Sequence, residues 1–315
     1  MGKLKIVFMG TPDFAVATLD RIVQSDYEVV GVITAPDKPA GRGRKISESA
    51  VKKYALTHNI PVLQPVKLRD PEFLSSLTAL GANLFIVVAF RMLPEIIWKL
   101  PAYGTINLHA SLLPDYRGAA PINWAVINGE RETGVTTFYI NEKIDTGEII
   151  LQSRTSIGEN ETAGELHNRL MELGADLIMK TIELIGSGEV TTRVQPLKEG
   201  YKTAPKIYKE NCRIDWDGGG QQIFNHIRGL SPYPGAWTRL HNGDQIAQVK
   251  VFLAEYRSGD HMDAVGKIHA DKKHIKVAVK DGYIYLEKIQ VAGKRRMTAS
   301  ELLNGLKISK DAYMS

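Results

Sequence analysis

An asparagine and a histidine two residues apart, Asn107 and His109, end an apolar run that predicts a β-strand over Thr105–His109. Side chains two apart on a strand leave the same face, and ligands bind beyond the carboxyl ends of strands in open parallel sheets. A polar turn over Lys143–Glu148 adds Asp145. An imidazole, a carboxamide and a carboxylate, with no plausible nucleophile, suit direct acyl transfer. Asn107 and His109 would stabilise the oxyanion, and Asp145 would orient the imidazole and pass protons.

Each cluster also has a simpler interpretation. The histidine could be satisfied within a turn, and Asp-Thr-Gly, residues 145–147, is often only a turn. The same tripeptide occurs in aspartic proteases, but their chemistry needs two aspartates that share a proton, and this chain has one such tripeptide. Gly10 ends the first apolar run, yet the dinucleotide and Walker glycine patterns are missing. Cys212 is the single cysteine, so neither a disulfide within the chain nor a cysteine metal cluster can form, and we expect no metal.

The elements that must position these residues alternate in the first half of the chain. Such alternation predicts an α/β fold, a Rossmann-like doubly wound and mostly parallel sheet. Short runs rich in Val and Ile predict buried strands, and the amphipathic stretches between them predict helices. The strands are Lys5–Met9, Val29–Thr34 and Leu84–Ala89, and the helices are Phe14–Gln24, Ser47–His58 and Pro71–Leu80. An antiparallel pair, Gly134–Ile140 and Glu148–Arg154, and a long helix over Ala163–Ile185 complete this part.

The pattern changes in the last third. Residues 189–208 are polar and contain proline and glycine, so we expect a linker between a domain over 1–188 and a second over 209–315. A helix over Gly220–Gly229 and several short alternating runs predict a smaller OB-like β-barrel. The runs are Ala236–His241, Gln245–Glu255, Val265–His269, His274–Lys280 and Tyr283–Gln290.

Composition limits the class of protein. Among 315 residues 43% are hydrophobic and 24% charged, and no apolar run approaches the roughly 20 residues of a membrane helix, so we expect a cytoplasmic protein without membrane contact. The net charge is +5, and residues 209–315 hold 17 Lys and Arg against 12 Asp and Glu. This excess favours a polyanionic partner such as nucleic acid, or is ordinary solubilising charge.

Several motifs make the chain resemble the folate-dependent formyltransferases over nearly its whole length. They are Phe8–Phe14, Asp37–Lys45, Asn107–Pro114, Arg117–Ile122, Thr133–Thr136, Asp145–Gly147, Arg213–Trp216 and Ala292–Lys294. The resemblance implies that Asn107, His109 and Asp145 form the catalytic set, and that Ser111, Leu112, Leu113 and Pro114 help to seat 10-formyltetrahydrofolate, the formyl donor. It also implies a Rossmann-like domain followed by an OB-like one. The run Phe90–Pro94 departs from the family, because it is one residue shorter than usual and has Arg91 in place of glycine.

The acceptor amine separates the members of this family. Glycinamide ribonucleotide formyltransferases are usually a single domain, whereas sugar-nucleotide N-formyltransferases can also carry a small β-domain. A non-enzymatic RNA-binding relative would lack the catalytic set, which is present here. The basic loop Pro39–Lys45 favours formylation of methionine on initiator Met-tRNA, for translation initiation, because such a loop can follow phosphates and reach unpaired bases; the alternative is a solvated loop without a partner role. Arg42 would discriminate the tRNA, Arg44, Lys45 and Lys206 would contact its backbone, and we expect a monomer.

Overall fold

The computed structural model describes residues 3–40, 45–196 and 200–315, with only the backbone at Ala40 and Lys45. The chain forms two compact units, which we describe separately. The first comprises Met1–Gly118, Glu132–Ser156 and His167–Thr203, and the second comprises Ala119–Arg131, Ile157–Leu166 and Ala204–Ser315. Each unit is therefore assembled from several stretches of chain, and the domain boundaries expected from the sequence stay a prediction.

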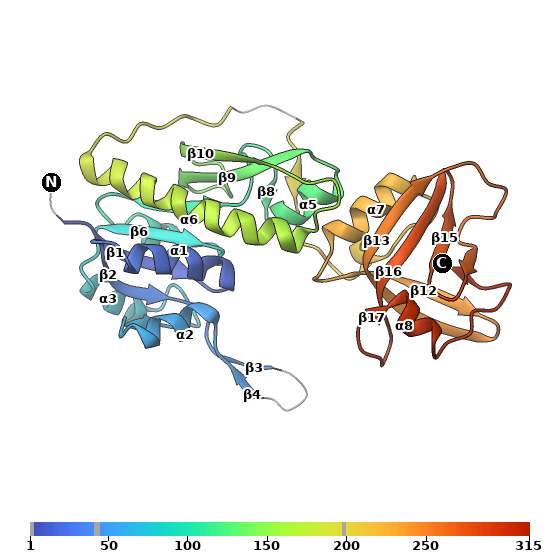
Figure 1. Cartoon of the computed structure of the whole chain (residues 1–315). Coiled ribbons are helices and arrows are strands. Elements are labelled where there is room, and N and C mark those ends of the chain that lie inside the picture. The colour runs from blue at the N-terminus through green and yellow to red at the C-terminus, as the bar shows by residue number, and fades with distance from the viewer. Residues whose placement is uncertain (1–2, 41–44, 197–199) are drawn as a thin grey trace. The chain divides into compact units, whose positions relative to one another are not determined.

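The first unit is built around a seven-stranded sheet with the order β10-β9-β7-β6-β1-β2-β5 (Figure 1). The neighbours β7, β6, β1, β2 and β5 are parallel, and β9 runs antiparallel to both β7 and β10. This arrangement confirms the Rossmann-like, mostly parallel sheet predicted above. The strands are β1 (Lys5–Gly10), β2 (Glu28–Ile33), β5 (Val62–Leu63), β6 (Leu84–Val88), β7 (Thr105–His109), β9 (Glu132–Tyr139) and β10 (Ile149–Ser156).

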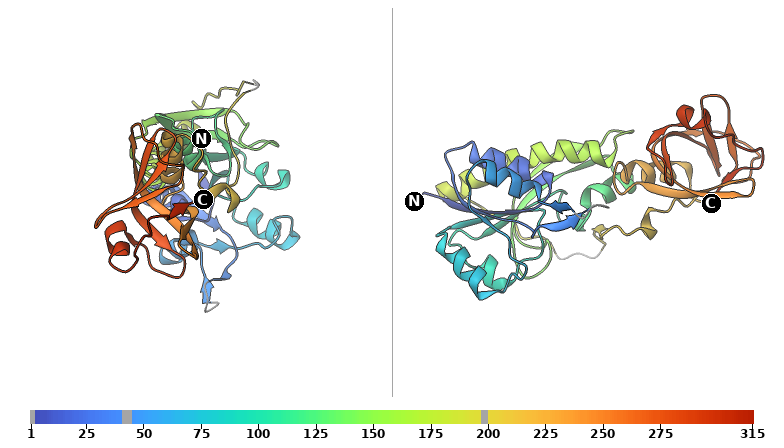
Figure 2. Two further views of the ribbon diagram at one scale, coloured as in Figure 1. Left: turned by 90° about the vertical axis from the view of Figure 1, so that its right-hand side faces the viewer. Right: turned by 90° about the horizontal axis from the view of Figure 1, so that it is seen from below.

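Helices cover both faces of this sheet. Figure 2 shows α1 and most of α6 on one face and α3 on the other. Val7 and Met9 of β1 pack in one cluster with Phe73 and Leu77 of α3. Because side chains alternate along a strand, the residues between them point to the other face of the sheet. Burial on both faces explains why the strands are continuous apolar runs. The helices are α1 (Asp13–Val23), α2 (Ala50–Thr57), α3 (Pro71–Ala79), α4 (Glu95–Trp98) and α6 (Ala163–Ser187).

Capping side chains set the helix starts. The hydroxyl of Ser49 accepts the Lys52 amide hydrogen at 3.0 Å, so α2 begins later than the sequence pattern predicts. The carboxylate of Asp70 accepts the amide hydrogen of Glu72 at 2.9 Å, and Pro71 occupies the first turn of α3. Both devices satisfy amide hydrogens that the helix itself leaves unpaired.

The second unit contains a barrel-like antiparallel sheet with the order β14-β15-β16-β13-β12-β18, and β17 pairs with β16. The two edges of the sheet approach each other where Met314 N–H donates to the Gly266 carbonyl at 2.9 Å and Ile268 N–H donates to the Ala312 carbonyl at 3.1 Å. The nearly closed sheet confirms the smaller β-barrel predicted above. Its strands are β12 (Ala236–Asn242), β13 (Gln245–Ser258), β14 (Ile268–Ala270), β15 (Ile275–Val279), β16 (Gly282–Val291), β17 (Met297–Thr298) and β18 (Tyr313–Met314).

Helix α7 (Gly220–Gly229) closes the core of this sheet, because Ile223, Phe224 and Ile227 pack among the apolar side chains of its strands. Three helices belong to the second unit, α5 (Pro121–Ile127), α7 and α8 (Ala299–Leu303) among the residues described. The remaining short elements are β3 (Lys38–Ala40), β4 (Lys45–Ser47), β8 (Arg117–Gly118), β11 (Thr203–Ala204) and the 3₁₀ turn η1 (Glu210–Cys212).

A largely buried histidine on α7 makes the stability of the second unit depend on pH. Burial lowers the pKa of His226, although backbone groups of Cys212 and Arg213 act in the opposite direction. Within the described residues its Nε2 atom has no hydrogen-bond partner. Because the unfolded chain takes up a proton at this site more readily than the folded chain, the free energy of unfolding should decrease as pH falls below about 6.5, and the decrease should end at the folded pKa.

We therefore expect His226→Gln to flatten the decrease of unfolding free energy on the acid side. The measurement is urea unfolding between about pH 5 and about pH 7.5, the range in which an ordinary histidine titrates. His58→Gln is the matched control, since it alters an exposed histidine and should keep the original slope. An unchanged slope in His226→Gln would contradict the assignment.

Candidate active site

His109 is the last residue of β7, at the carboxyl end of the parallel part of the sheet. Asn107 precedes it by two residues and therefore faces the same side of the strand. The His109 side chain is 7% exposed, and Asn107 is half-buried. Across the sheet Asn107 stands beside Val87 of β6 and Phe138 of β9. The structure thus brings the two residues to the edge where ligands of such sheets bind.

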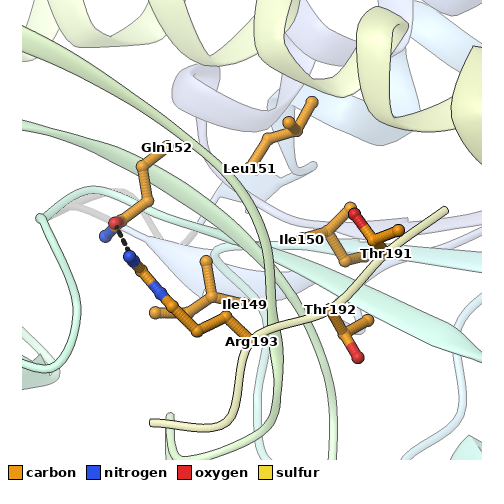
Figure 3. Close-up of a pocket in the computed structure, with 7 residues that line it drawn as sticks. All are labelled: Ile149, Ile150, Leu151, Gln152, Thr191, Thr192 and Arg193. Carbon is orange, nitrogen blue, oxygen red and sulfur yellow. Dashed lines mark hydrogen bonds between the residues drawn. The ribbon is translucent and has the colours of Figure 1, made fainter.

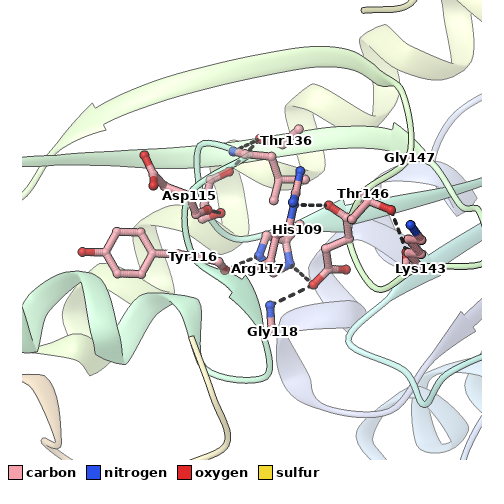
Figure 4. A network of polar contacts seen from close by, with 12 residues as sticks. His109, Asp115, Tyr116, Arg117, Gly118, Thr136, Lys143, Thr146 and Gly147 are labelled. Atoms are coloured by element: carbon pink, nitrogen blue, oxygen red, sulfur yellow. Dashed lines mark hydrogen bonds and ion pairs between the residues drawn. The ribbon is translucent and has the colours of Figure 1, made fainter. Parts of the chain in front are cut away.

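Each nitrogen of the His109 ring faces an acceptor (Figure 4). Nε2 lies 2.8 Å from the carbonyl oxygen of Tyr116, and Nδ1 lies 3.7 Å from Oδ2 of Asp145. A carbonyl oxygen only accepts, so Nε2 carries a hydrogen and donates it. The distance from Nδ1 to the carboxylate is an ion-pair distance rather than a hydrogen bond. Nδ1 is therefore the ring nitrogen left for proton exchange or for a substrate.

Asp145 is held in place through both its side chain and its backbone. The Gly118 amide donates to the Oδ2 atom of Asp145 at 2.9 Å, and Arg117 Nε donates to the backbone carbonyl of Asp145 at 3.0 Å. The φ angle of Asp145 is 54°, and that of Tyr116 is 61°. Left-handed backbone is unfavourable for both residue types and persists where surrounding contacts fix it, which is common at functional sites.

Gly147 lets the turn after Asp145 approach β9. A Cβ atom at this position would lie 1.6 Å from the carbonyl oxygen of Tyr139. Only a movement of the backbone could relieve this clash. The glycine of the Asp-Thr-Gly sequence is thus required by this close approach, and the turn that carries Asp145 sits directly against the sheet.

The loop that follows His109 is fixed by buried hydrogen bonds. Thr136 of β9 donates its hydroxyl to the Ser111 carbonyl at 2.7 Å and accepts the Leu113 amide hydrogen at 3.2 Å. The Ser111 hydroxyl is buried and donates to the Asp115 carbonyl at 2.7 Å. Leu113 packs into a core cluster, whereas Leu112 and Pro114 are only partly buried. Two of the four residues predicted to seat a ligand therefore have side chains committed to the interior.

Gln195, whose side chain is 4% exposed and bonds to the Asp145 turn, is a site residue that was not predicted from the sequence. Arg117 and the carbonyl of Tyr116 also have roles here that the sequence did not indicate. Gln195 lies in the polar segment expected to be a linker, and no motif marks it. A backbone carbonyl carries no residue-specific signal, so the partner of His109 Nε2 could be found only in three dimensions.

Two family models match the chain. One, described as formyl transferase, matches residues 4–182, and the other, described as formyl transferase, C-terminal domain, matches residues 206–307. The first alone spans more than half of the 315 residues. The chain belongs to the formyl transferase family.

The relatives of this formyl transferase agree with the assignment. It is 55% identical to methionyl-tRNA formyltransferase of Flavobacterium johnsoniae over 99% of both chains. It resembles the N-formyltransferase from Helicobacter canadensis, solved with folinic acid and dTDP-3-aminofucose, with a TM-score of 0.63 and 19% identity over 93% of this chain and 100% of that chain. HypX from Aquifex aeolicus, solved with tetrahydrofolic acid, gives a TM-score of 0.66 and 16% identity over 98% of this chain and 49% of that chain. The two structural likenesses show the fold.

The loop Phe90–Pro94 of this formyl transferase is anchored by Arg91. The Arg91 guanidinium donates to the carbonyl of Val66 at 3.0 Å and also to the carbonyl of Pro65. Burial lowers the pKa of Arg91. Arg91 thus lies at the surface with its guanidinium bound to backbone, and it ties the loop after β6 to the segment after β5.

A surface cavity of about 320 Å³ lies along β10 (Figure 3). At its edge Arg193 Nη2 donates to Gln152 Oε1 at 2.7 Å, and Gln152 Nε2 donates to the Leu113 carbonyl at 2.9 Å. The cavity is lined by Ile149, Ile150, Leu151, Gln152, Thr191, Thr192 and Arg193. None of the predicted catalytic residues lines it, and its one link to the loop after His109 among the bonds above is the hydrogen bond from Gln152 to Leu113.

The structure describes the residues predicted to contact tRNA only in part. Arg42 and Arg44 lie outside the described residues, and Lys45 is described only as backbone of β4, which pairs with β3 in an antiparallel hairpin. Lys206 is exposed, and its Nζ lies 5.5 Å from the ring centroid of Tyr208. Contact with tRNA therefore stays a prediction.

No cluster of three or more His, Cys, Asp or Glu suited to a metal ion occurs in residues 3–40, 45–196 and 200–315. In the same part of the chain no helix combines the length and apolar character that crossing a membrane requires.

Proposed function

We propose that this chain transfers the formyl group of 10-formyltetrahydrofolate to the α-amino group of methionine on initiator Met-tRNA. The observation that supports this choice of acceptor is the 55% identity with a methionyl-tRNA formyltransferase over 99% of both chains. Initiation of translation takes place where charged tRNA is found, so a cytoplasmic location belongs to the same proposal. Action as a monomer belongs to the same proposal.

In the proposed reaction the α-amino nitrogen of methionine attacks the formyl carbon. The carbonyl oxygen becomes an oxyanion, which Asn107 and a protonated His109 stabilise by donating hydrogen bonds. Because the Tyr116 carbonyl engages Nε2, the donor on His109 is Nδ1. Asp145 takes the proton from the attacking nitrogen and passes it, directly or through water, to the folate nitrogen N10 as the bond between N10 and the formyl carbon breaks. The 3.7 Å separation of Nδ1 and Asp145 Oδ2 supports a shared role in this transfer.

The donor is proposed to sit beside the loop Ser111–Pro114. Relatives with the same fold were solved with tetrahydrofolic acid and with folinic acid, which supports a reduced folate as the formyl carrier. The partly buried side chains of Leu112 and Pro114 offer apolar contact to the ligand. Ser111 and Leu113, which face inward, contribute through the shape of the backbone. No metal takes part in this proposal.

The acceptor is proposed to contact Arg42, Arg44 and Lys45 of the hairpin loop and Lys206. The basic excess of residues 209–315 supports a tRNA-binding role for this part of the chain, since lysine and arginine neutralise phosphates. In this proposal residues 1–188 form the catalytic domain, and 189–208 lead into the tRNA-binding domain over 209–315.

The test is a panel of acceptors with labelled 10-formyltetrahydrofolate. We expect initiator Met-tRNA to acquire the label with a kcat/KM about 100-fold or more above that of elongator Met-tRNA, glycinamide ribonucleotide or an amino-sugar nucleotide, because binding contacts of the correct substrate are missing in the others. Preferred labelling of the amino-sugar nucleotide or of glycinamide ribonucleotide would replace the proposed acceptor. Label transfer to none of them would refute the reaction.

A further inference from the structure

Gln195 uses its whole hydrogen-bonding capacity on the turn that carries Asp145. Its Nε2 donates to the backbone carbonyl of Asp145 at 3.0 Å and to the carbonyl of Gly147 at 2.8 Å. Its Oε1 accepts from Arg117, at 3.2 Å from Nε and 2.5 Å from Nη2. A primary amide has two hydrogens to donate and two lone pairs to accept, so every site is used.

These bonds bear on the position of the Asp145 carboxylate. The Asp145 carbonyl receives hydrogen bonds from both Gln195 Nε2 and Arg117 Nε. Since the backbone of Asp145 is left-handed, it needs such contacts to stay in place. A shift of this carbonyl rotates the residue and changes the 3.7 Å separation between its carboxylate and His109.

The same segment of chain also holds the other partner of His109. The Tyr116 amide donates to the Lys202 carbonyl at 2.6 Å, and the Lys202 amide donates to the Asp115 carboxylate at 2.9 Å. Tyr116 is the residue whose carbonyl accepts the hydrogen of His109 Nε2. The segment that follows α6 thus holds the partners of both ring nitrogens of His109.

We propose that Gln195 is a positioning residue for formyl transfer, which keeps the Asp145 carboxylate at the distance from His109 that the reaction needs. This inference rests on the proposed function. Gln195 does not touch the reacting atoms and acts through Asp145. If Gln195 had a purely structural role, it would only satisfy buried carbonyls. Its substitution would then lower stability, and the effect on kcat would be the same with or without the Asp145 side chain.

The experiment is a double-mutant cycle with Gln195→Leu and Asp145→Ala. In the otherwise unchanged protein we expect Gln195→Leu to lower kcat about 10- to 100-fold with little change in the KM for the donor, because a misplacement of about 1 Å can cost about 100-fold. In the Asp145→Ala background the same change should lower kcat by less than about twofold, since a residue acting through a missing partner has no further effect. Equal losses in the two backgrounds would overturn the proposal.

Two further variants separate the contacts. Gln195→Glu can still accept from Arg117 but cannot donate to the carbonyls of Asp145 and Gly147, so its kcat should fall as in Gln195→Leu. Thr192→Val is the matched control from the same segment, because it removes a bond to Glu148 and none to Asp145. Its kcat should stay at the level of the unchanged protein, and a loss like that of Gln195→Leu would overturn the proposal.

A spectroscopic measurement tests the inference independently of turnover. The ¹⁵N chemical shifts of the His109 ring report the surroundings of each nitrogen. Gln195→Leu and Gln195→Glu should move the Nδ1 signal, which faces Asp145, more than the Nε2 signal, which faces Tyr116. An unchanged Nδ1 signal would overturn the inference even in an active enzyme. If the unchanged protein formylates nothing, the proposed function fails while the Nδ1 signal still decides whether Gln195 positions Asp145.

Discussion

His109→Ala is expected to lower the kcat of formyl transfer by about 1000-fold or more, which corresponds to about 4 kcal/mol of lost transition-state stabilisation. One oxyanion donor is worth about 100- to 1000-fold, and a group that moves protons about 100- to 10,000-fold. His109 is proposed to stabilise the oxyanion and to assist Asp145 in the proton transfer, and both contributions are lost together. The dissociation constants of folate and Met-tRNA should remain nearly unchanged, because the oxyanion exists only during the reaction.

The measurement is single-turnover formylation, which separates chemistry from product release. His58→Ala, which alters an exposed histidine of the first unit, is the control and should keep full activity. The unfolding midpoint of His109→Ala should be compared as well, because the substitution removes the hydrogen bond from His109 to the Tyr116 carbonyl. Rapid turnover in a folded His109→Ala protein would remove His109 from the mechanism.

Asp145→Asn is expected to lower kcat by about 100- to 10,000-fold while the protein stays folded. The asparagine oxygen can still accept the Gly118 amide hydrogen, so the turn keeps its anchor. The new amide group can donate a hydrogen bond to Nδ1 of His109. This bond keeps the ring neutral and occupies the Nδ1 lone pair, which can then no longer exchange a proton. The charge that would balance a protonated imidazole is also lost.

The effect of Asp145→Asn is measured on kcat and on the unfolding midpoint in parallel. Asp176→Asn is the matched control, since Asp176 pairs with Arg21 on the surface of the first unit and has no contact with His109. We expect the control to retain its activity. A kcat close to that of the unchanged protein in Asp145→Asn would show that the carboxylate charge is dispensable.

The sheet of the first unit was predictable because its strands are buried on both faces. β1, β2 and β6 are largely apolar runs, and the observed bounds of these strands and of β7 differ from the predicted ones by a residue or less at each end. Shorter elements gave no such pattern. β5 is the pair Val62–Leu63, and β18 is the pair Tyr313–Met314, so neither is long enough to show an alternation of apolar and polar residues.

The candidate site was predictable where neighbours in sequence are neighbours in space. Asn107 and His109 share a face because strand geometry repeats every two residues. Asp145 came from a recognisable turn. Gln195 follows Asp145 by 50 residues, and it bonds to backbone carbonyls that any residue could present. Contacts of this kind depend on how distant parts of the chain fold against each other, so the local sequence pattern does not predict them.

The interleaving of the two units decides how this gene could be divided. A gene fragment ending at codon 188 would encode His109 and Asp145 but would omit Gln195 and Lys202, so its product would keep the reacting groups without the segment that fixes them. A fragment beginning at codon 209 would omit Ala119–Arg131 and Ile157–Leu166, which belong to the second unit. A cut in the gene between the regions that match the two family models therefore does not separate the two structural units of the protein.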